Sequence, residues 1–245
     1  MGQPCTIFVP GTNITRALET EFAEWNGNAH CLAYPNGTMA ILAAIYAAGV
    51  RKGDEIICPS MTYWGSCTQA LQLGAVVVFA DICLDTLCID EDDIEHRITP
   101  NTKAIVAVHY AGYPCKMDKI CAIAKKHGVK VIEDMSHAHG ATYKGQKVGT
   151  FGDVAAMSIM SGKSLASAEG GLLVTDDRRI LETAILFTHY ESADRITIED
   201  LKATAGMPHS GSKGRMAQIS SAIGRVQVSD VMNIMPNDDE YAEVT

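Results

Sequence analysis

The sequence predicts an α/β fold in which helices cover a mostly parallel β-sheet. Short apolar runs rich in β-branched residues alternate with amphipathic or Ala-rich segments along the 245 residues. Hydrophobic residues make up 47% of the chain and charged residues 20%, which is typical of a globular protein with a large core. The repeated β–α–β order implies right-handed crossovers, and such crossovers join parallel neighbours.

The first segment, residues 1–14, contains recurring Gly and Pro and is predicted to be an irregular arm. A helix is predicted over residues 15–25 because Leu18, Phe22 and Trp25 recur at helical spacing. Amphipathic or Ala-rich segments predict further helices at 39–48, 91–98, 117–127, 178–187 and 215–228. Short apolar runs predict strands at 55–58, 76–80, 104–108, 129–132, 154–160 and 171–175. Residues 188–214 are predicted to form a long polar loop, and the domain at 15–235 is followed by a frayed tail at 236–245.

Composition excludes several classes of protein. A net charge of −9 argues against a nucleic-acid partner, which would need a basic patch. No apolar run approaches the ~18 residues of a membrane span, and the beginning of the sequence does not resemble a secretory leader. The eight cysteines include no CxxC pair, so we expect a reduced, cytoplasmic protein without a metal site. No GxGxxG follows the early strands, so a dinucleotide-binding fold lacks its fingerprint.

Three chemically distinct side chains follow consecutive predicted strands. The strand at 129–132 runs into Glu133 and Asp134, and the strand at 154–160 leads through Ser158 to Lys163. Ligands of open α/β sheets bind beyond the carboxyl ends of the strands. A carboxylate buried there is costly unless a cation or several donors compensate it. Glu133 should face the opposite side from Asp134, because side chains alternate along a strand, and it is not assigned to the site.

Pyridoxal phosphate is a ligand that would use all three groups. The acid, Asp134, would hold a ring nitrogen protonated, the hydroxyl of Ser158 would bind phosphate, and Lys163 would form a Schiff base with the aldehyde. Each residue also has an ordinary explanation on its own, because Lys163 could be a surface lysine and Asp134 could cap a helix. The residues alone leave both explanations open, and only the combination favours the cofactor.

Several short motifs occur in a fixed order along the chain and together resemble one family. They are Asn36-Gly37-Thr38, Pro59-Ser60-Met61-Thr62-Tyr63, Val108-His109-Tyr110-Ala111-Gly112, Ile132-Glu133-Asp134-Met135-Ser136-His137-Ala138-His139-Gly140, Ser158 five residues before Lys163, and Glu169-Gly170-Gly171. From about residue 18 to about residue 228 the chain resembles the sugar aminotransferases of the DegT/StrS type, which are pyridoxal-phosphate enzymes of fold type I. The resemblance implies a three-layer, cofactor-binding large domain with a mostly parallel central sheet, and a homodimer.

The resemblance also implies a role for each site residue. Lys163 would be the Schiff-base lysine and would carry protons, and Asp134 would pair with the pyridinium nitrogen. Gly37 and Thr38 would contact the cofactor phosphate together with Ser158, at the N-terminus of the helix predicted over residues 39–48. Such a helix N-terminus presents free N–H groups and a partial positive charge. Without the resemblance, Asn36 or Thr38 would be taken as an ordinary helix cap.

Aromatic and imidazole side chains complete the implied site. Tyr63 occupies the position from which family members stack a ring on the pyridine face, although the residues alone would favour a core tyrosine. His137 would lie near the phenolic oxygen of the cofactor, and the alternative is a structural histidine. His139 is interpreted as structural, and His109 is predicted to line the substrate pocket.

By resemblance, the chain would move an amino group from glutamate or glutamine to a nucleotide-linked keto-sugar or a cyclitol ketone, in nucleotide-sugar and polysaccharide biosynthesis. Two alternatives are a truncated, non-catalytic protein that binds the cofactor or a partner chain, and a related sugar dehydratase. The dehydratases carry His in place of the lysine, and this chain has Lys163.

The sequence departs from the family at three places. Lys213 stands where most members have an Asn that reaches the phosphate of the neighbouring subunit, and His189-Tyr190-Glu191 replaces a more usual His-Gly. A lysine could still bind phosphate as a point charge. Family members are also considerably longer, so we expect the small C-terminal domain to be largely missing from this chain.

Overall fold

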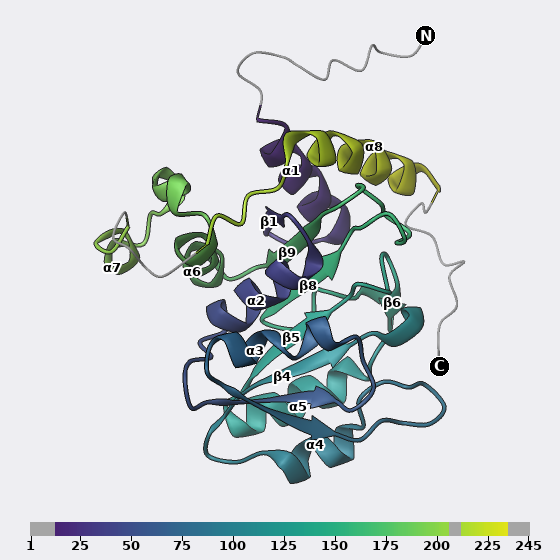
Figure 1. Ribbon diagram of the computed structural model, residues 1–245. Coiled ribbons are helices and arrows are strands. Elements are labelled where there is room, and N and C mark those ends of the chain that lie inside the picture. The colour runs from purple at the N-terminus through teal and green to yellow at the C-terminus, as the bar shows by residue number, and fades with distance from the viewer. Residues whose placement is uncertain (1–12, 206–211, 235–245) are drawn as a thin grey trace.

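A seven-stranded sheet lies at the centre of the computed structural model, which describes residues 13–205 and 212–234 (Figure 1). The strand order is β1-β9-β8-β5-β4-β2-β3. Four neighbouring pairs are parallel, whereas β9 runs antiparallel to both β8 and β1. The prediction of an α/β fold with a mostly parallel sheet is therefore confirmed. The strands are β1 (His30–Tyr34), β2 (Glu55–Pro59), β3 (Val76–Ala80), β4 (Thr102–Val108), β5 (Lys130–Asp134), β8 (Val154–Ser158) and β9 (Gly171–Thr175), and a small separate hairpin joins β6 (Thr142–Tyr143) to β7 (Gln146–Lys147).

Helices cover both faces of this sheet and give three layers. The described α-helices are α1 (Ile14–Asn26), α2 (Gly37–Ala47), α3 (Gln69–Gln72), α4 (Glu91–Arg97), α5 (Met117–His127), α6 (Arg178–Thr188), α7 (Glu199–Lys202) and α8 (Gln218–Ile234), with 3-10 turns η1 (Trp64–Ser66), η2 (Tyr110–Gly112) and η3 (Tyr190–Arg195). One core cluster joins the sheet to α2, α3 and α6. On the opposite face α4 and α5 cover one half of the sheet, and α1 and α8, which lie side by side, cover the other half (Figure 1).

Helix α2 is the most deeply enclosed helix of the fold and its N-terminus reaches the end of β8. Its sequence is almost entirely apolar, and it packs against β8, β9 and α6. The Asn36 side chain accepts a hydrogen bond from the Met39 N–H at 2.9 Å, so Asn36 is the N-cap. Because packing rather than amphipathicity stabilises α2, its position depends on the sheet beneath it.

The predicted elements agree with the structure closely in places. The bounds of β3, β9 and α5 match the prediction, and Gly27 and Gly128 end α1 and α5 in the left-handed conformation at φ 92° and 67°. Strand β1, the β6–β7 hairpin and α3 were not predicted. The helix predicted from residue 215 begins at Gln218, and the loop predicted over 188–214 contains η3 and α7.

The predicted arm and tail fall largely outside the described residues. Residues 1–12, 206–211 and 235–245 are not described, and helix α1 already begins at Ile14. Seven cysteines lie in the described ranges and all are free thiols. Among the described helices, none has the length and apolarity required to cross a lipid bilayer.

Candidate active site

A cavity of about 650 Å³ opens at the carboxyl ends of β4, β5 and β8. Polar atoms from the N-terminus of α2, the turn after β2 and the loops after β5 and β8 converge on it. All seven residues that the sequence predicted for the site line this cavity: Gly37, Thr38, Tyr63, Asp134, His137, Ser158 and Lys163. Segments separated by more than a hundred residues in sequence therefore meet where the carboxyl ends of the parallel strands predict a ligand site.

The N-terminus of α2 forms one wall of the cavity and closely approaches the end of β8. A Cβ atom placed on Gly37 would lie 2.6 Å from the Cβ of Ser158, so a side chain at this position would collide with the strand. An α-helix leaves its first N–H groups without intrahelical partners, and its dipole makes this end positive. Gly37, Thr38 and the Ser158 hydroxyl together form a cradle suited to an anionic group.

Asp134 is the last residue of β5 and points into the cavity. One carboxylate oxygen accepts a hydrogen bond from the Ser66 hydroxyl at 2.6 Å, and the other accepts one from the Ser136 N–H at 3.0 Å. The residue is only 4% exposed. A carboxylate has about four acceptor positions, so two donors leave it able to bind a further cationic or N–H group from the cavity.

Glu133 faces the opposite side of the sheet, as the alternation of the strand predicted. Its carboxylate is fully buried and accepts hydrogen bonds from the ring of His109 at 3.0 Å and from the N–H groups of Gly149, Phe151 and Gly152 at 2.7–2.9 Å. The prediction that His109 lines the substrate pocket is wrong. Glu133 and the Cys115 N–H hold the imidazole of His109 inside the core, where it has no exposed surface.

Lys163 lies in the connection between β8 and β9, which folds back on itself. The Ser161 N–H donates to the Ala168 carbonyl at 2.9 Å, and the Lys163 N–H donates to the Met160 carbonyl at 3.0 Å. Burial lowers the pKa of the half-buried Lys163 amine, while the negative charge of Asp134 acts in the opposite direction. A lysine with a lowered pKa has more of the neutral, nucleophilic form near pH 7.

Two histidines follow Asp134, and they occupy different surroundings. His137 lines the cavity, where its Nδ1 accepts a hydrogen bond from the Ala111 N–H at 3.3 Å. Burial, with a smaller contribution from the charge of Lys163, lowers the pKa of His137, so its imidazole is neutral at pH 7. His139 is buried and accepts a hydrogen bond from the Leu165 N–H at 3.1 Å, which anchors the Lys163 loop. His139 thus has the structural position expected of it.

Tyr63 stands at the mouth of the cavity and is 63% exposed, so it is not a core residue. A Cβ atom on Gly65 would lie 2.8 Å from the Tyr63 ring, which shows that the ring rests on the backbone of η1. Trp64 is 69% exposed, and its ring packs edge-on against Tyr63 with centroids 6.3 Å apart. An exposed aromatic ring beside a polar cavity is suited to stacking on a planar ligand.

The sequence interpretation missed several residues of the cavity wall. The hydroxyls of Thr62, Ser66 and Ser136 and the carboxylate of Glu169 also line the cavity. Thr62, Ser136 and Glu169 lie inside motifs that carry the resemblance, so position within a motif was an available signal. Ser66 lies outside those motifs, and only the fold brings it to Asp134.

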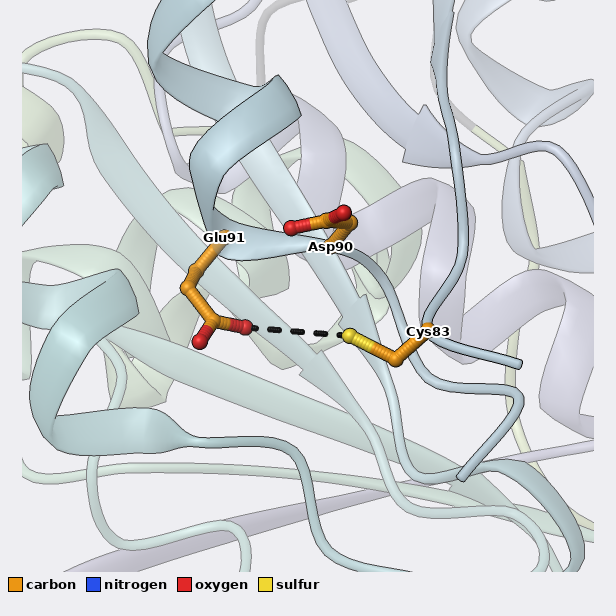
Figure 2. Close-up of side chains that lie close together, drawn as sticks. All are labelled: Cys83, Asp90 and Glu91. Atoms are coloured by element: carbon orange, nitrogen blue, oxygen red, sulfur yellow. Dashed lines mark hydrogen bonds between the residues drawn. The ribbon is translucent and has the colours of Figure 1, made fainter. Parts of the chain in front are cut away.

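A separate group of potential metal ligands consists of Cys83, Asp90 and Glu91 (Figure 2). The Glu91 carboxylate accepts hydrogen bonds from the ammonium groups of Lys116 at 3.0 Å and Lys119 at 2.7 Å, and the Cys83 thiol contacts its other oxygen at 4.0 Å. Two cations already compensate this carboxylate, so the group is better described as an ion-pair network than as a metal site.

Comparison with known proteins gives one family. A model of the DegT/DnrJ/EryC1/StrS aminotransferase family matches residues 7–244. GDP-perosamine synthase from Escherichia coli O157:H7 is 34% identical over 95% of this chain and 62% of its own length. L-glutamine:2-deoxy-scyllo-inosose aminotransferase from Streptomyces kanamyceticus is 43% identical over 66% of this chain and 38% of its own length.

A solved structure described as GDP-4-keto-6-deoxymannose-3-dehydratase with a trapped PLP-glutamate geminal diamine superposes with a TM-score of 0.81 and 28% identity, over 89% of this chain and 61% of that one. With the three layers described above, this likeness confirms the predicted fold type I class. The chain spans less than two thirds of the length of each of these three proteins.

Proposed function

Because the chain belongs to the DegT/DnrJ/EryC1/StrS aminotransferase family, we propose that it transfers an amino group to the keto group of a sugar or cyclitol with pyridoxal phosphate as its cofactor. The convergence of Lys163, Asp134 and the N-terminus of α2 on one cavity carries the proposal. These groups are an amine, an acid and an anion cradle, which are the three groups that this cofactor requires of a protein.

The cavity fits the cofactor in its chemistry. The absence of a side chain at Gly37 lets the N-terminus of α2 pack directly against Ser158, so Gly37, Thr38 and Ser158 line the same part of the cavity. Asp134 would face the ring nitrogen, Tyr63 would cover the ring, and Thr38 would contact the phosphate. When bound, pyridoxal phosphate supplies an aldehyde that reacts with amines and a ring that withdraws electrons from the bonds of the substrate.

The side chains of the site then have separate tasks. Lys163 would hold the cofactor through its Nζ atom and, once released by the amino donor, would take and return the proton at the reacting carbon. Burial keeps a larger share of the lysine neutral, as a general base requires. Asp134 would remain in place as the anionic partner of the ring nitrogen, and the neutral His137 would offer a hydrogen bond near the phenolic oxygen.

The names of the two relatives support the proposed substrates. One is a synthase of a GDP-linked amino sugar, and the other uses glutamine to aminate a cyclitol ketone. We therefore propose glutamate or glutamine as the donor, and a nucleotide-linked keto-sugar or a cyclitol ketone as the acceptor. The matching dehydratase structure keeps the dehydratase alternative open at the level of the fold. Lys163 argues against it, because the dehydratases that the sequence resembles carry His at this position.

We further propose that two copies of the chain form a homodimer and that residues 15–235 form the cofactor-binding domain. The exposed Tyr63 ring at the mouth of the cavity and the exposed Trp64 ring beside it support a covering partner. The exposed Lys213 would take the place of the usual inter-subunit phosphate ligand. Sedimentation velocity should give the mass of a dimer, and a monomer that binds the cofactor tightly would contradict the proposal. Residence in the cytoplasm stays a prediction.

The lysine provides the test of function. Borohydride reduction of the protein with added pyridoxal phosphate should attach the cofactor to Lys163, and peptide mass spectrometry should locate it there. The Lys163→Ala variant should lose the label and at least 10³-fold in amino-transfer rate. Lys147→Ala is the matched control, because burial also lowers the pKa of Lys147, whose amine lies against Trp25 away from the cavity.

Excess glutamate separates catalysis from binding alone. Wild-type protein with bound cofactor should release 2-oxoglutarate in a single turnover, and an added keto-sugar or cyclitol ketone should complete the cycle. Retained cofactor without 2-oxoglutarate would instead support a non-catalytic protein. Labelling at a lysine other than Lys163 would contradict the assignment of the site.

A further inference from the structure

The carboxylate of Asp134 is held by a side chain from a distant part of the chain. Ser66, at the end of η1, donates a hydrogen bond from its hydroxyl to the Asp134 carboxylate at 2.6 Å. Both residues are almost fully buried, at 2% and 4% exposed. This short O–H···O⁻ contact lies in the range of strong, charge-assisted hydrogen bonds.

The direction of the Ser66 hydroxyl is itself fixed. The Thr62 hydroxyl donates to the Ser66 oxygen at 3.1 Å, so the Ser66 proton is directed to Asp134. The Ser66 N–H donates to the Tyr63 carbonyl at 3.0 Å, which closes the 3-10 turn. The result is a chain of hydrogen bonds in which Thr62 donates to Ser66 within one short turn, and Ser66 donates across to Asp134 at the end of β5.

The second oxygen of Asp134 is held from the other side. The Ser136 N–H binds it at 3.0 Å from the loop that follows β5. With one donor on each oxygen, the plane of the carboxylate is set, and its remaining acceptor positions face the cavity. Without Ser66, only the local turn of Asp134 and Ser136 would orient this carboxylate.

We infer that Ser66 is a positioning residue that aims the Asp134 carboxylate at the ring nitrogen of the cofactor. The inference rests on the proposed function, because it assigns Asp134 to that nitrogen. Ser66 and Tyr63 belong to the same turn, so one segment would set both the partner of the ring nitrogen and the aromatic cover of the ring. Displacement of this turn would therefore disturb two contacts to the cofactor together.

Other charged or titratable groups also act on Asp134, and the test leaves them in place. Lys163 and His137 interact with its charge across the cavity, and the thiol of Cys58, at the end of β2, interacts with it from within the sheet. In the described part of the chain, the Ser66 hydroxyl is hydrogen-bonded to Thr62 and Asp134 and to none of these three side chains. A change seen in a Ser66 variant can therefore be separated from a change in these groups.

The test compares four proteins: the wild type, Ser66→Ala, Ser66→Thr and Ser221→Ala. Ser221 is the matched control, because its hydroxyl is fully buried and hydrogen-bonded to Thr15 at 2.8 Å on the far side of the fold. The first measurement is the Kd of pyridoxal phosphate from quenching of tryptophan fluorescence. The second is the 15N chemical shift of the ring nitrogen in labelled cofactor, followed against pH.

Ser66→Ala should raise the Kd roughly tenfold, and the ring nitrogen should lose its proton at a lower pH than in the wild type. Ser66→Thr should restore both values to within about twofold, because it returns the hydroxyl. Ser221→Ala should match the wild type in both measurements. A Ser66→Ala protein with the wild-type Kd and the wild-type 15N titration would overturn the inference.

Thr62→Val provides a second route if Ser66→Ala does not fold. It removes the donor that directs the Ser66 hydroxyl, and it should change both measurements in the same direction by a smaller factor. An unchanged 15N titration in Thr62→Val would then count against the inference. Wild-type protein that does not bind the cofactor at all would instead contradict the proposed function, so the two failures are distinguishable.

Discussion

The two faces of β5 carry neighbouring carboxylates in opposite circumstances. Glu133 and Asp134 are both buried, at 0% and 4% exposed. On one face, four donors surround Glu133 and occupy its acceptor capacity. On the other, two donors hold Asp134, and the rest of its carboxylate faces a cavity that also contains Lys163.

This difference shows that burial alone does not identify a functional acid. Burial by itself raises the pKa of Glu133, but the hydrogen bond and charge of His109 and the N–H groups of Gly152 and Gly149 outweigh it, so the pKa lies below its ordinary value. Such a carboxylate is ionised, satisfied and closed to ligands. Asp134 differs in having unused acceptor capacity toward the cavity, and this property distinguishes the side of the strand on which the candidate site lies.

The largest expected effect is a loss of stability, and it concerns the face of β5 that carries Glu133. Glu133→Gln should lower the free energy of unfolding by about 3–5 kcal/mol, because it removes the charge that His109 and three N–H groups compensate. Urea denaturation of the cofactor-free protein measures this loss. A loss below about 1 kcal/mol would mean that the network contributes little and that the comparison between the two faces is wrong.

The face of β5 that carries Asp134 should show the reverse pattern, with a large effect on the reaction rate and a small effect on stability. Asp134→Asn should reduce the rate of the half-reaction with glutamate by roughly 10²–10³-fold, because the ring nitrogen would lose its anionic partner. The free energy of unfolding should change by only about 1 kcal/mol, because the Asn oxygen can still accept from the Ser136 N–H and the Ser66 hydroxyl oxygen can accept from the Asn NH2 group. Single-turnover kinetics and urea denaturation on the same preparation test both halves of the prediction.

The smallest expected effect is on the pH dependence of stability, and it concerns His139, which is buried behind the Lys163 loop. Burial lowers the pKa of His139 to about 4 from an ordinary value of 6.5. Between these values the unfolded chain binds a proton that the folded chain does not, so stability is fully present above pH 6.5 and is lost as the pH falls toward 4. For this residue the loss between pH 7 and pH 5 should be on the order of 2 kcal/mol.

The variant His139→Asn isolates that contribution. Asn keeps an acceptor for the Leu165 N–H but does not titrate, so its unfolding free energy should change less between pH 7 and pH 5 than that of the wild type. His189, whose pKa is also lowered to about 4 by burial, titrates in the same window in both proteins. Equal pH dependence in the two proteins would show that folding does not lower the pKa of His139.

Local patterns predicted the fold where an element is stabilised by its own sequence. The amphipathic α5 with its terminal Gly128 matches its predicted bounds, as does the apolar β3. Strand β1 was missed because His30–Tyr34 is a short apolar run whose strand character comes from antiparallel pairing with β9. The start of α8 was placed three residues too early, because the first hydrogen bond of the helix runs from the Ser221 N–H to the Ala217 carbonyl and the helix therefore begins at Gln218.

The residues that line the cavity could be predicted where a reactive or polar side chain follows the end of a strand. Asp134, Ser158 and Lys163 were found from strand ends, and the resemblance added Gly37, Thr38, Tyr63 and His137. His109 was misassigned because its position one residue after β4 does not reveal that its ring turns inward to Glu133. Ser66 could not be found, because its contact with Asp134 spans 68 residues and exists only in the folded chain.

If the proposed site is correct, the position of α2 within the fold would link binding of the cofactor to folding. Its N-terminus is assembled by three segments, since Gly37 meets Ser158 and a side chain on Gly171 would collide with the Asn36 carbonyl. The unfolded chain has no such arrangement and offers the phosphate nothing to recognise. A ligand that binds only the native state stabilises it by mass action, by about 2.7 kcal/mol at a hundred times its Kd. The supply of cofactor would thus set how much of this protein stays folded under thermal stress.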